Sequence, residues 1–328
     1  MLLISESDVK KALTADDVIE AVIAAYRDYS ENLIDVPPRV TINVRGESDS
    51  AIFLTANYRS MPFYGIKQAS SFPSNIKKGG KTVMSDIHLY STETGEQLAM
   101  VSATHLTAMK TGAASAVATK FLAREGEAIL AIIGTGVQAR NQLDGVQRVR
   151  PLVQVCLYDL DQGKANEFAR YIELTKNRNY RVKIFDNPNE CIHGADIVIT
   201  TTTSTKPVFS GNYIAEGTHI NAVGSFTPHM QEIDSKTVVR ANKIVTDTCE
   251  ETWSVAGDLL VPLKEGKITE KKIYAELGDI VAGKTPGREN EKEITIYESV
   301  GFAALDIAVA IAAYKKSLTL KIGAKIEQ

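Results

Sequence analysis

The sequence has few cysteines and no cysteine motif. Its 328 residues include 3 cysteines, Cys156, Cys191 and Cys249, which lie far apart with no Cys-x-x-Cys among them. A disulfide framework or a zinc ribbon needs paired or closely spaced cysteines, so neither is expected. Because reduced, unpaired thiols are typical of proteins of the reducing cytoplasm, the sequence predicts a cytoplasmic protein.

Long apolar runs and an excess of charge are also missing. The longest apolar stretch, 302–314, carries Asp306 and is shorter than the ~20 residues that a bilayer span requires. The N-terminus turns polar at Ser5 without a basic region, so no signal peptide is expected. Lys and Arg number 37 against 40 Asp and Glu, with the signs well mixed, so neither a nucleic acid nor a membrane is expected as a partner.

What the sequence does contain is typical of a globular protein with about two domains. Residues 1–35 are predicted to be helical, with capping patterns at Ser5-x-x-Asp8 and Thr14-x-x-Asp17. Beyond Pro37, short alternating runs predict a small, largely antiparallel sheet. Two further helices are predicted at 105–124 and 300–314, and 283–292 is predicted to be a surface loop.

The pattern changes after Gly126, where apolar strands alternate with helices. The predicted strands are 128–133, 153–158, 181–185, 196–200, 218–223 and 243–246, and the predicted helices are 137–149, 162–176 and 231–240. Nearly continuous apolar strands separated by helices indicate a parallel sheet covered on both faces.

A glycine-rich turn, Gly134-Thr135-Gly136-Val137-Gln138-Ala139, follows the first of these strands and opens a helix. Its glycines permit a tight turn and close approach of a pyrophosphate to the helix N-terminus. A turn without a ligand is the alternative. The next strand ends at Asp159, in position to accept hydrogen bonds from ribose hydroxyls, and this context favours dinucleotide binding.

Asp159 also bears on the choice of cofactor. A 2′-phosphate would place a second negative charge beside its carboxylate, and 160–162 supply no Arg or Lys. NAD(H) is therefore expected, with NADP(H) as the alternative. A competing interpretation is that Asp159 only caps the helix that begins near Asp161.

Several further blocks resemble the ornithine cyclodeaminase/μ-crystallin family. They are Lys110-Thr111-Gly112-Ala113-Ala114-Ser115, Ile220-Asn221-Ala222-Val223-Gly224-Ser225, Ala256-Gly257-Asp258-Leu259, Glu276-Leu277-Gly278-Asp279-Ile280-Val281, Pro286-Gly287-Arg288 and Ser299-Val300-Gly301-Phe302-Ala303. The resemblance implies an α/β fold in which a Rossmann-type parallel-sheet dinucleotide-binding domain, 126–299, is inserted in an α+β substrate-binding and dimerisation domain, 1–125 plus 300–328. It also implies a homodimer.

The resemblance assigns roles to three basic residues. Arg39 and Lys110 would bind a substrate carboxylate, and Lys67 would contact the substrate and serve as the catalytic residue. From the residues alone, a solvated strand end is the favoured interpretation of Arg39. A solvent-facing strand position is likewise favoured over a cleft for Lys67. Many family members have Arg where this chain has Lys110, so the carboxylate geometry is expected to differ.

The resemblance also implies a set of cofactor contacts. They are Thr82, Lys110, Thr111, Gly134, Gly136, Val137, Gln138, Asp159, Thr201, Val223, Gly224 and Ser299. No metal is expected, because the histidines and cysteines show no ligand spacing.

The chain departs from the family's cyclodeaminases, which place an aspartate at the position of Phe226 as a general base and a lysine at that of Met230. Phe226 cannot accept a proton. His229 is either a substitute or a solvent-facing residue. The resemblance therefore favours an NAD(P)-dependent oxidoreductase that transfers hydride at the α-carbon of a small amino or imino acid, such as a reductase of pyrroline-2-carboxylate or an alanine dehydrogenase. The alternatives are an ornithine cyclodeaminase and a non-enzymatic protein that binds a nucleotide or small acid.

Overall fold

The computed structural model describes residues 1–46, 49–175 and 179–327 and divides the chain into two compact units. Unit 1 comprises Met1–Lys110 with Phe302–Gln328, and unit 2 comprises Thr111–Gly301. Unit 2 is thus inserted in the sequence of unit 1. The first boundary falls inside helix α3 (Thr104–Leu122) rather than after residue 125, and the second follows residue 301 rather than 299. The functions expected of the two domains stay predictions.

Unit 1 contains a mixed sheet and its covering helices. Its strands are β1 (Leu2–Ile4), β2 (Ile34–Asp35), β3 (Val40–Arg45), β4 (Asp49–Tyr58), β5 (Phe63–Ser71), β6 (Val83–Ser91), β7 (Gln97–Ser102) and β16 (Ala324–Lys325). Its helices are α1 (Glu6–Ala12), α2 (Ala15–Ser30), the short 3₁₀ helix η1 (Pro73–Lys78) and α11 (Ala303–Leu320).

The strands of unit 1 follow the order β16-β1-β7-β6-β5-β4-β2, and β3 pairs with β4. Neighbours are antiparallel except β1 and β7, which confirms the largely antiparallel sheet. The prediction that all of 1–35 is helical is wrong at β1 and β2. Three apolar residues at 2–4 pair with strands that lie far along the chain, and no local pattern specifies such pairing.

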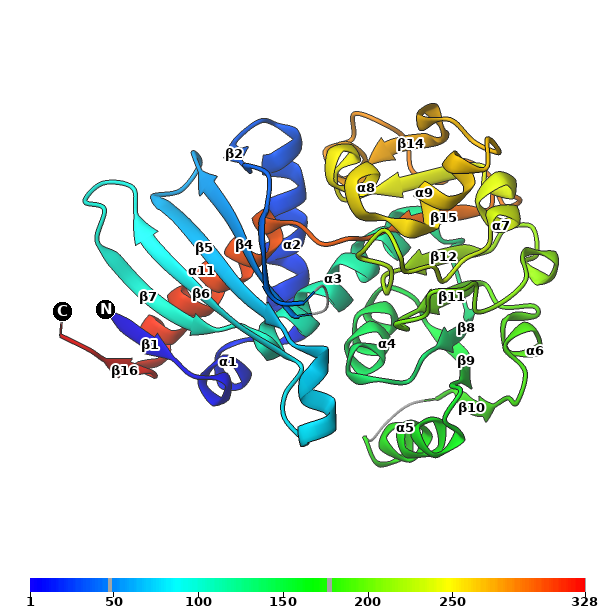
Figure 1. The fold of residues 1–328 in the computed structure, drawn as a ribbon, viewed down its shortest axis with the longest axis horizontal. Coiled ribbons are helices and arrows are strands. Elements are labelled where there is room, and N and C mark those ends of the chain that lie inside the picture. The colour runs from blue at the N-terminus through cyan, green and yellow to red at the C-terminus, as the bar shows by residue number, and fades with distance from the viewer. Residues whose placement is uncertain (47–48, 176–178, 328) are drawn as a thin grey trace. The chain divides into compact units, whose positions relative to one another are not determined.

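Helix α11 lies against strands β4 to β7 and beside α2 (Figure 1). Most of its residues are buried, among them Leu305, Ile307 and Val309. It begins at Ala303 and extends to Leu320, whereas the sequence predicted 300–314. A helix that is apolar around most of its circumference is typical of a protein core. Asp306, in the first turn of α11, is therefore buried inside unit 1.

Unit 2 contains a parallel sheet. Its strands are β8 (Ala128–Ile133), β9 (Leu152–Tyr158), β10 (Arg181–Ile184), β11 (Ile197–Thr200), β12 (His219–Ala222), β13 (Lys243–Thr246), β14 (Ile273–Glu276) and β15 (Thr295–Glu298). Its helices are α4 (Val137–Val149), α5 (Gln162–Leu174), α6 (Pro188–Ile192), α7 (Ser235–Arg240), α8 (Cys249–Val255), α9 (Gly257–Lys264) and α10 (Leu277–Val281), with the 3₁₀ turns η2 (Gly211–Tyr213) and η3 (Glu270–Lys272).

The strand order is β10-β9-β8-β11-β12-β15-β13-β14, with every pairing parallel. This confirms the predicted parallel sheet, although β14 and β15 were not predicted. The helix predicted at 231–240 begins only at Ser235, because Asp234 caps it. The last residue of the helix predicted at 162–176 lies outside the described residues.

Two apolar clusters cover the two faces of this sheet. On β8, Leu130 and Ile132 pack with α4 and α5, while Ala131 and Ile133 pack with α6, α7 and α9. Figure 1 shows α4 and α6 on opposite sides of the strands. Alternate residues of one strand are therefore buried in different clusters, which explains why the strands of unit 2 have nearly continuous apolar sequences.

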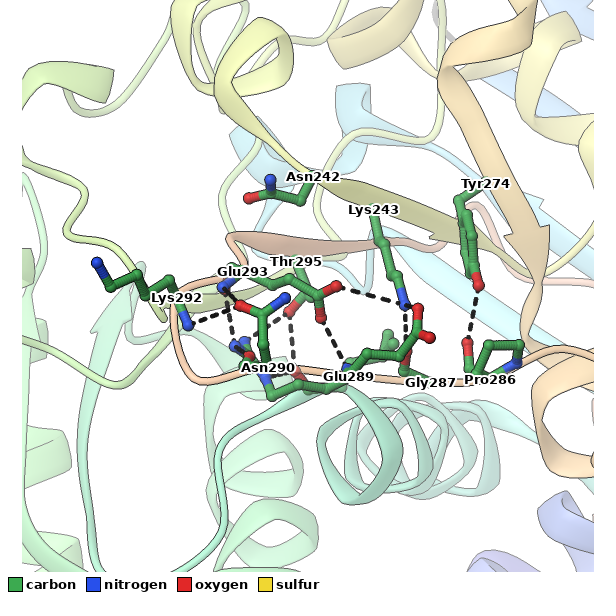
Figure 2. A network of polar contacts seen from close by, with 12 residues as sticks. Asn242, Lys243, Tyr274, Pro286, Gly287, Glu289, Asn290, Lys292, Glu293 and Thr295 are labelled. Carbon is green, nitrogen blue, oxygen red and sulfur yellow. Dashed lines mark hydrogen bonds and ion pairs between the residues drawn. The ribbon is translucent and has the colours of Figure 1, made fainter.

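The irregular segment 283–292 is held against the amino ends of β13 and β15 (Figure 2). The Lys243 ammonium donates to the Gly287 carbonyl at 2.6 Å and to Glu289 Oε2 at 2.5 Å, and it lies 4.6 Å from the centre of the Tyr274 ring. Arg288 Nε donates to the Leu122 carbonyl at 2.7 Å. The Pro-Gly-Arg block thus satisfies carbonyls at the C-terminus of α3, a structural task.

No helix in the described part of the chain is both long and apolar enough to cross a membrane.

Candidate functional site

The glycine-rich turn follows β8 at the carboxyl edge of the parallel sheet. Gly134 has a φ of 90°, a conformation that favours glycine. A Cβ there would lie 2.8 Å from Thr202 Cγ2 and 2.9 Å from the Thr201 carbonyl oxygen. The Thr201 hydroxyl donates to the Gly134 carbonyl at 2.7 Å. Gly134 is therefore required by backbone conformation and by the close approach of the chain after β11.

Gly136 is not required by its backbone conformation. Its lack of a side chain instead leaves open space before α4. It is the N-cap of α4 and makes no side-chain cap, and no atom lies within 4 Å of the position of an added Cβ. The next residue, Val137, is 77% exposed, and Gln138 Oε1 is buried with no donor among the described residues. Free amides at a helix N-terminus with open space before them suit a pyrophosphate, so the turn fits a dinucleotide.

Asp159 lies directly after β9 and accepts hydrogen bonds from the Thr135 amide at 2.7 Å, the Thr135 hydroxyl at 2.9 Å and the Asp161 amide at 3.0 Å. Burial alone raises the pKa of Asp159, but these hydrogen bonds outweigh it and the pKa lies below its usual value. Asp161, not Asp159, caps α5 by accepting from the Gly163 amide at 2.9 Å. The capping interpretation of Asp159 is therefore wrong.

The ends of β11 and β12 lie beside the turn and are joined by one carboxylate. Glu232 accepts from the Thr200 hydroxyl at 2.7 Å, from the Gly224 amide at 2.8 Å and from the Thr202 amide. A Cβ on Gly224 would overlap Glu232 and the Thr202 carbonyl. Val223, next to Gly224, is half-buried. These contacts fix the two predicted cofactor residues Val223 and Gly224 at the carboxyl edge.

Ser299 follows β15 at the same edge and is held by Asp247. Its hydroxyl donates to Asp247 Oδ2 at 2.8 Å, the Gly301 amide donates to the same oxygen at 3.0 Å, and the Tyr297 hydroxyl donates to Asp247 Oδ1 at 2.5 Å. Asp247 is fully buried. The Asp247 carboxylate therefore fixes the backbone and side chains of residues 297–301, which include the end of β15.

Three buried acids lie near this edge, and the sequence analysis assigned a role to none of them. Asp258 Oδ1 accepts from the amides of Glu232 at 2.6 Å and Ile233 at 2.9 Å, while both oxygens of Glu298 have no hydrogen-bond partner in the described structure. Burial, together with the negative charges of the other acids, raises the pKa of Glu298 and of Asp258 well above the usual range, and burial raises that of Glu232. This cluster therefore favours protonated carboxyl groups.

The predicted substrate residues come together in unit 1, around Asp306 of α11. Lys67 Nζ on β5 donates to Asp306 Oδ1 at 2.8 Å and to the Thr107 hydroxyl at 2.8 Å, and Lys110 Nζ on α3 donates to Asp306 Oδ2 at 3.2 Å. The side chains of Lys67 and Lys110 are only 7% and 5% exposed. Lys67 therefore does not face solvent.

The charges in this cluster act on one another. Burial lowers the pKa of Lys67, Asp306 opposes that shift, and the positive charges of Lys110 and Arg39 add to it. Burial raises the pKa of Asp306, but Lys110 and Lys67 outweigh it and the pKa lies below its usual value. Arg39, half-buried before β3, is thus close enough to Lys67 to influence its ionisation.

The remaining predicted residues lie as follows. Thr82 precedes β6 in unit 1, and its carbonyl accepts from the Phe72 amide at 2.6 Å. Thr111 begins the unit 2 part of α3, and its carbonyl accepts from Gln142 Nε2 at 3.3 Å. Phe226 and His229 are exposed and Met230 is buried. The cofactor and substrate roles of all these residues stay predictions.

The buried His219 is held by hydrogen bonds within the sheet. His219 is bonded to the Thr295 hydroxyl at 3.0 Å and to Asn221 at 3.3 Å, and burial lowers its pKa to about 3. In the described ranges, no three side chains of His, Cys, Asp or Glu are grouped so that they could hold a metal ion.

These features define a dinucleotide-binding protein of the Rossmann type. They are a parallel sheet, a glycine-rich turn after β8, an acid after β9 and a helix N-terminus that faces open space. The chain belongs to the ornithine cyclodeaminase/mu-crystallin family, whose model matches residues 1–320.

Relatives of this family match the chain over its whole length. The Delta(1)-pyrroline-2-carboxylate reductase of Bacillus cereus is 38% identical, with 100% of both chains covered, and the alanine dehydrogenase of Archaeoglobus fulgidus is 35% identical, with 99% of this chain and 98% of its own covered. The structure of Thermococcus litoralis Delta(1)-pyrroline-2-carboxylate reductase in complex with NADH and L-proline is 40% identical, with a TM-score of 0.95 over 99% of this chain and 100% of that chain.

The open space at Gly136 gives a direct test of the cofactor turn. Gly136→Ala meets no neighbour within 4 Å, so the thermal midpoint should change by no more than a few degrees. A methyl group in the space that a pyrophosphate approaches should weaken NADH binding by about tenfold or more, measured by fluorescence titration. Binding at the parent affinity would remove the turn from the cofactor site.

The unpartnered Glu298 predicts a pH-dependent stability. The folded chain holds a proton that the unfolded chain releases above the ordinary pKa of 4.5, so the parent loses stability as pH rises from that value towards the raised one. Glu298→Gln has no such proton. Its free energy of unfolding relative to the parent should therefore increase as the pH rises above about 4.5, by up to about 1.4 kcal/mol per pH unit, and its melting temperature relative to the parent should increase with it.

Melting curves across that pH range check this, with the exposed Glu190→Gln as a control for the loss of a surface charge. A constant difference between Glu298→Gln and the parent would show that Glu298 ionises normally in the folded protein.

Proposed function

We propose that the protein is an NADH-dependent reductase of a small cyclic imino acid, with Delta(1)-pyrroline-2-carboxylate as substrate and proline as product. The observation that carries this proposal is the basic cluster of Lys67 and Lys110 around Asp306, in a chain that is 38% to 40% identical to two reductases of that imino acid. Such a cluster suits a carboxylate, and a carboxylate next to C=N is what this substrate presents.

The cofactor would be held by unit 2. The N-terminus of α4 at Gly136 would receive the pyrophosphate, and Asp159, ionised at neutral pH, would accept from the ribose hydroxyls. Bound NADH supplies a hydride to the imine carbon. The closest cation in sequence after Asp159 is Lys164, within α5, so a 2′-phosphate has no adjacent counter-charge from this segment. We therefore propose NADH rather than NADPH.

The substrate would be held by the basic residues of unit 1. Arg39 and Lys110 would bind the carboxylate, with Arg39 offering a planar pair of donors. Lys67 would donate from Nζ to the substrate, either orienting the carboxylate or supplying a proton at the imine nitrogen, because burial lowers its pKa towards the range of a useful acid. Reduction of a protonated C=N in this orientation gives the amine.

Alanine dehydrogenation is a second candidate, favoured by the 35% identity to the Archaeoglobus fulgidus enzyme over nearly the whole chain. Ornithine cyclodeamination has less support. It needs a base for the side-chain amine, Phe226 is no base, and the exposed His229 makes no hydrogen bond that would orient it among those described.

We also propose a homodimer formed by the outer face of the unit 1 sheet. Strand β3 is exposed along its whole length and carries Val40, Ile42 and Val44, each at least half exposed. Beside it, a groove of about 650 Å³ is lined in part by the stacked rings of Tyr64 and Tyr90. An exposed apolar strand is a liability in a monomer, which a second copy would cover. The cytoplasmic location stays a prediction.

The proposed reaction predicts a substrate profile. With Delta(1)-pyrroline-2-carboxylate the purified protein should consume NADH, and NADPH should be used at least about tenfold less efficiently. Piperideine-2-carboxylate and pyruvate with ammonia test larger imines and alanine formation, and ammonia release from ornithine with catalytic NAD tests cyclodeamination. Release of ammonia without net consumption of cofactor would contradict the proposal. The absence of activity with every substrate would contradict it as well.

In the same assay, Arg39→Ala and Lys67→Ala should each lower kcat/KM for the imino acid by about 30-fold or more, because each removes a charged donor to the carboxylate. The affinity for NADH should be unchanged. Arg45→Ala is the matched control, since Arg45 is exposed and pairs with Asp49. Normal turnover in Arg39→Ala and Lys67→Ala would exclude them from the site.

The proposed interface predicts a dimer that a single charge disrupts. Light scattering coupled to gel filtration should give twice the chain mass, and Ile42→Glu should shift the mass towards that of one chain, because a buried charge would lie in the apolar contact. The control is Leu174→Glu at a 70% exposed apolar residue of α5. A monomeric parent, or an Ile42→Glu dimer as stable as the parent, would contradict the interface.

A further inference from the structure

Asp306 is an isolated acid in an apolar helix, and its position in the fold is unusual. It lies within the first turn of α11 between Leu305 and Ile307, is 2% exposed, and has the ammonium groups of Lys67 and Lys110 on its two oxygens. These two lysines, on β5 and α3, are 43 positions apart in sequence. One carboxylate thus joins three separate elements of unit 1.

The carboxylate of Asp306 offsets the repulsion between the two buried ammonium groups. Two ammonium groups in a buried site repel each other, and each loses its hydration, so both effects favour the neutral amine. A carboxylate that accepts from both offsets the repulsion and fixes where each nitrogen lies. The Thr107 hydroxyl, one helical turn before Lys110, accepts from Lys67 as well, so the Lys67 nitrogen is held by two acceptors from two elements.

We propose that Asp306 is a positioning residue of the substrate site, which keeps Lys67 and Lys110 charged and aligned so that both can donate to one substrate carboxylate. This inference rests on the proposed function of the two lysines. Asp306 would not bind the substrate carboxylate, since two negative charges at close range repel each other, and its own oxygens accept from the two lysines. Its effect would pass through Lys67 and Lys110 to the substrate carboxylate.

The other groups around Asp306 are accounted for. The charge of Arg39 acts on Lys67, and Asp306 acts on the buried Tyr58 of β4, whose hydroxyl donates to the Ala304 carbonyl at 2.7 Å. Burial, followed by the negative charges of Asp28 and Asp306, raises the pKa of Tyr58 well above its usual range, so this hydroxyl stays neutral. The ionisation that removal of Asp306 would change is therefore that of Lys67.

The test uses Asp306→Asn, which keeps the size of the side chain and removes its charge. At about pH 8, kcat/KM for Delta(1)-pyrroline-2-carboxylate should fall by about 30-fold or more, mainly through KM, while the dissociation constant of NADH changes less than about twofold. At about pH 6 the loss should be several-fold smaller, because a lower pH favours the protonated form of Lys67, whose pKa burial lowers.

Asp49→Asn is the matched control. Asp49 is 1% exposed in the same unit and is bonded by Ser74 at 2.7 Å and Arg45 at 3.1 Å, so it measures the cost of neutralising a buried, paired aspartate elsewhere. Its kcat/KM should stay near that of the parent. A loss in Asp306→Asn that is equal at both pH values, or that Asp49→Asn reproduces, would show a structural role only and overturn the proposal.

A second measurement does not depend on turnover. NMR titration of ¹³C-labelled lysine, with signals assigned through Lys67→Arg and Lys110→Arg, should show Lys67 losing its proton at a lower pH in Asp306→Asn than in the parent. An unchanged titration would overturn the proposal. If Asp306→Asn does not fold, the titration of the parent is the test, and a neutral Lys67 at pH 7 would overturn the proposal. A parent inactive with every imino acid would contradict the proposed function, while the titration still tests Asp306.

Discussion

The structure of unit 2 depends on one geometric constraint, that the carboxyl ends of parallel strands meet at a single edge of the sheet. Each predicted cofactor residue from Gly134 onward lies within a few residues of such an end. Gly134 follows β8, Asp159 follows β9, Thr201 follows β11, Val223 follows β12 and Ser299 follows β15. Residues more than 160 positions apart are therefore neighbours along one edge, and a dinucleotide long enough to follow that edge can contact them all.

The same constraint explains why buried acids gather there. Strand ends leave amides without sheet partners, and these amides need acceptors. Asp159 accepts from the turn after β8, Glu232 from the segments after β11 and β12, and Asp258 from the amides of residues 232 and 233. Asp258, in a block that only a family resemblance singled out, thus has a definite task in the backbone. Glu298 has no such donor, and its neutral form is the physical consequence.

The sequence predicted the elements whose patterns are local. The strands from β8 to β13, the glycine-rich turn and Asp159 followed from apolar runs and glycine spacing, and the capping boxes at Ser5 and Thr14 are present. What it did not predict depends on contacts between distant residues. Strand β15 (Thr295–Glu298) was not predicted, and its place is set by pairing with both β12 and β13 inside the sheet. The role of Asp306 was equally hidden, because its lysine partners lie on β5 and α3.

The two units bury charge in opposite ways, and the difference has a physical meaning. In unit 1, Asp306 is buried with two cations, so its pKa falls and the charged form is the stable one. In unit 2, Glu298 is buried with other acids, so its pKa rises and the neutral form is the stable one. A buried ion pair holds donors in fixed directions for an anion, whereas a neutral carboxyl adds no negative charge to the edge of the sheet at which a dinucleotide is proposed to bind. Each arrangement therefore suits the ligand proposed for its own unit.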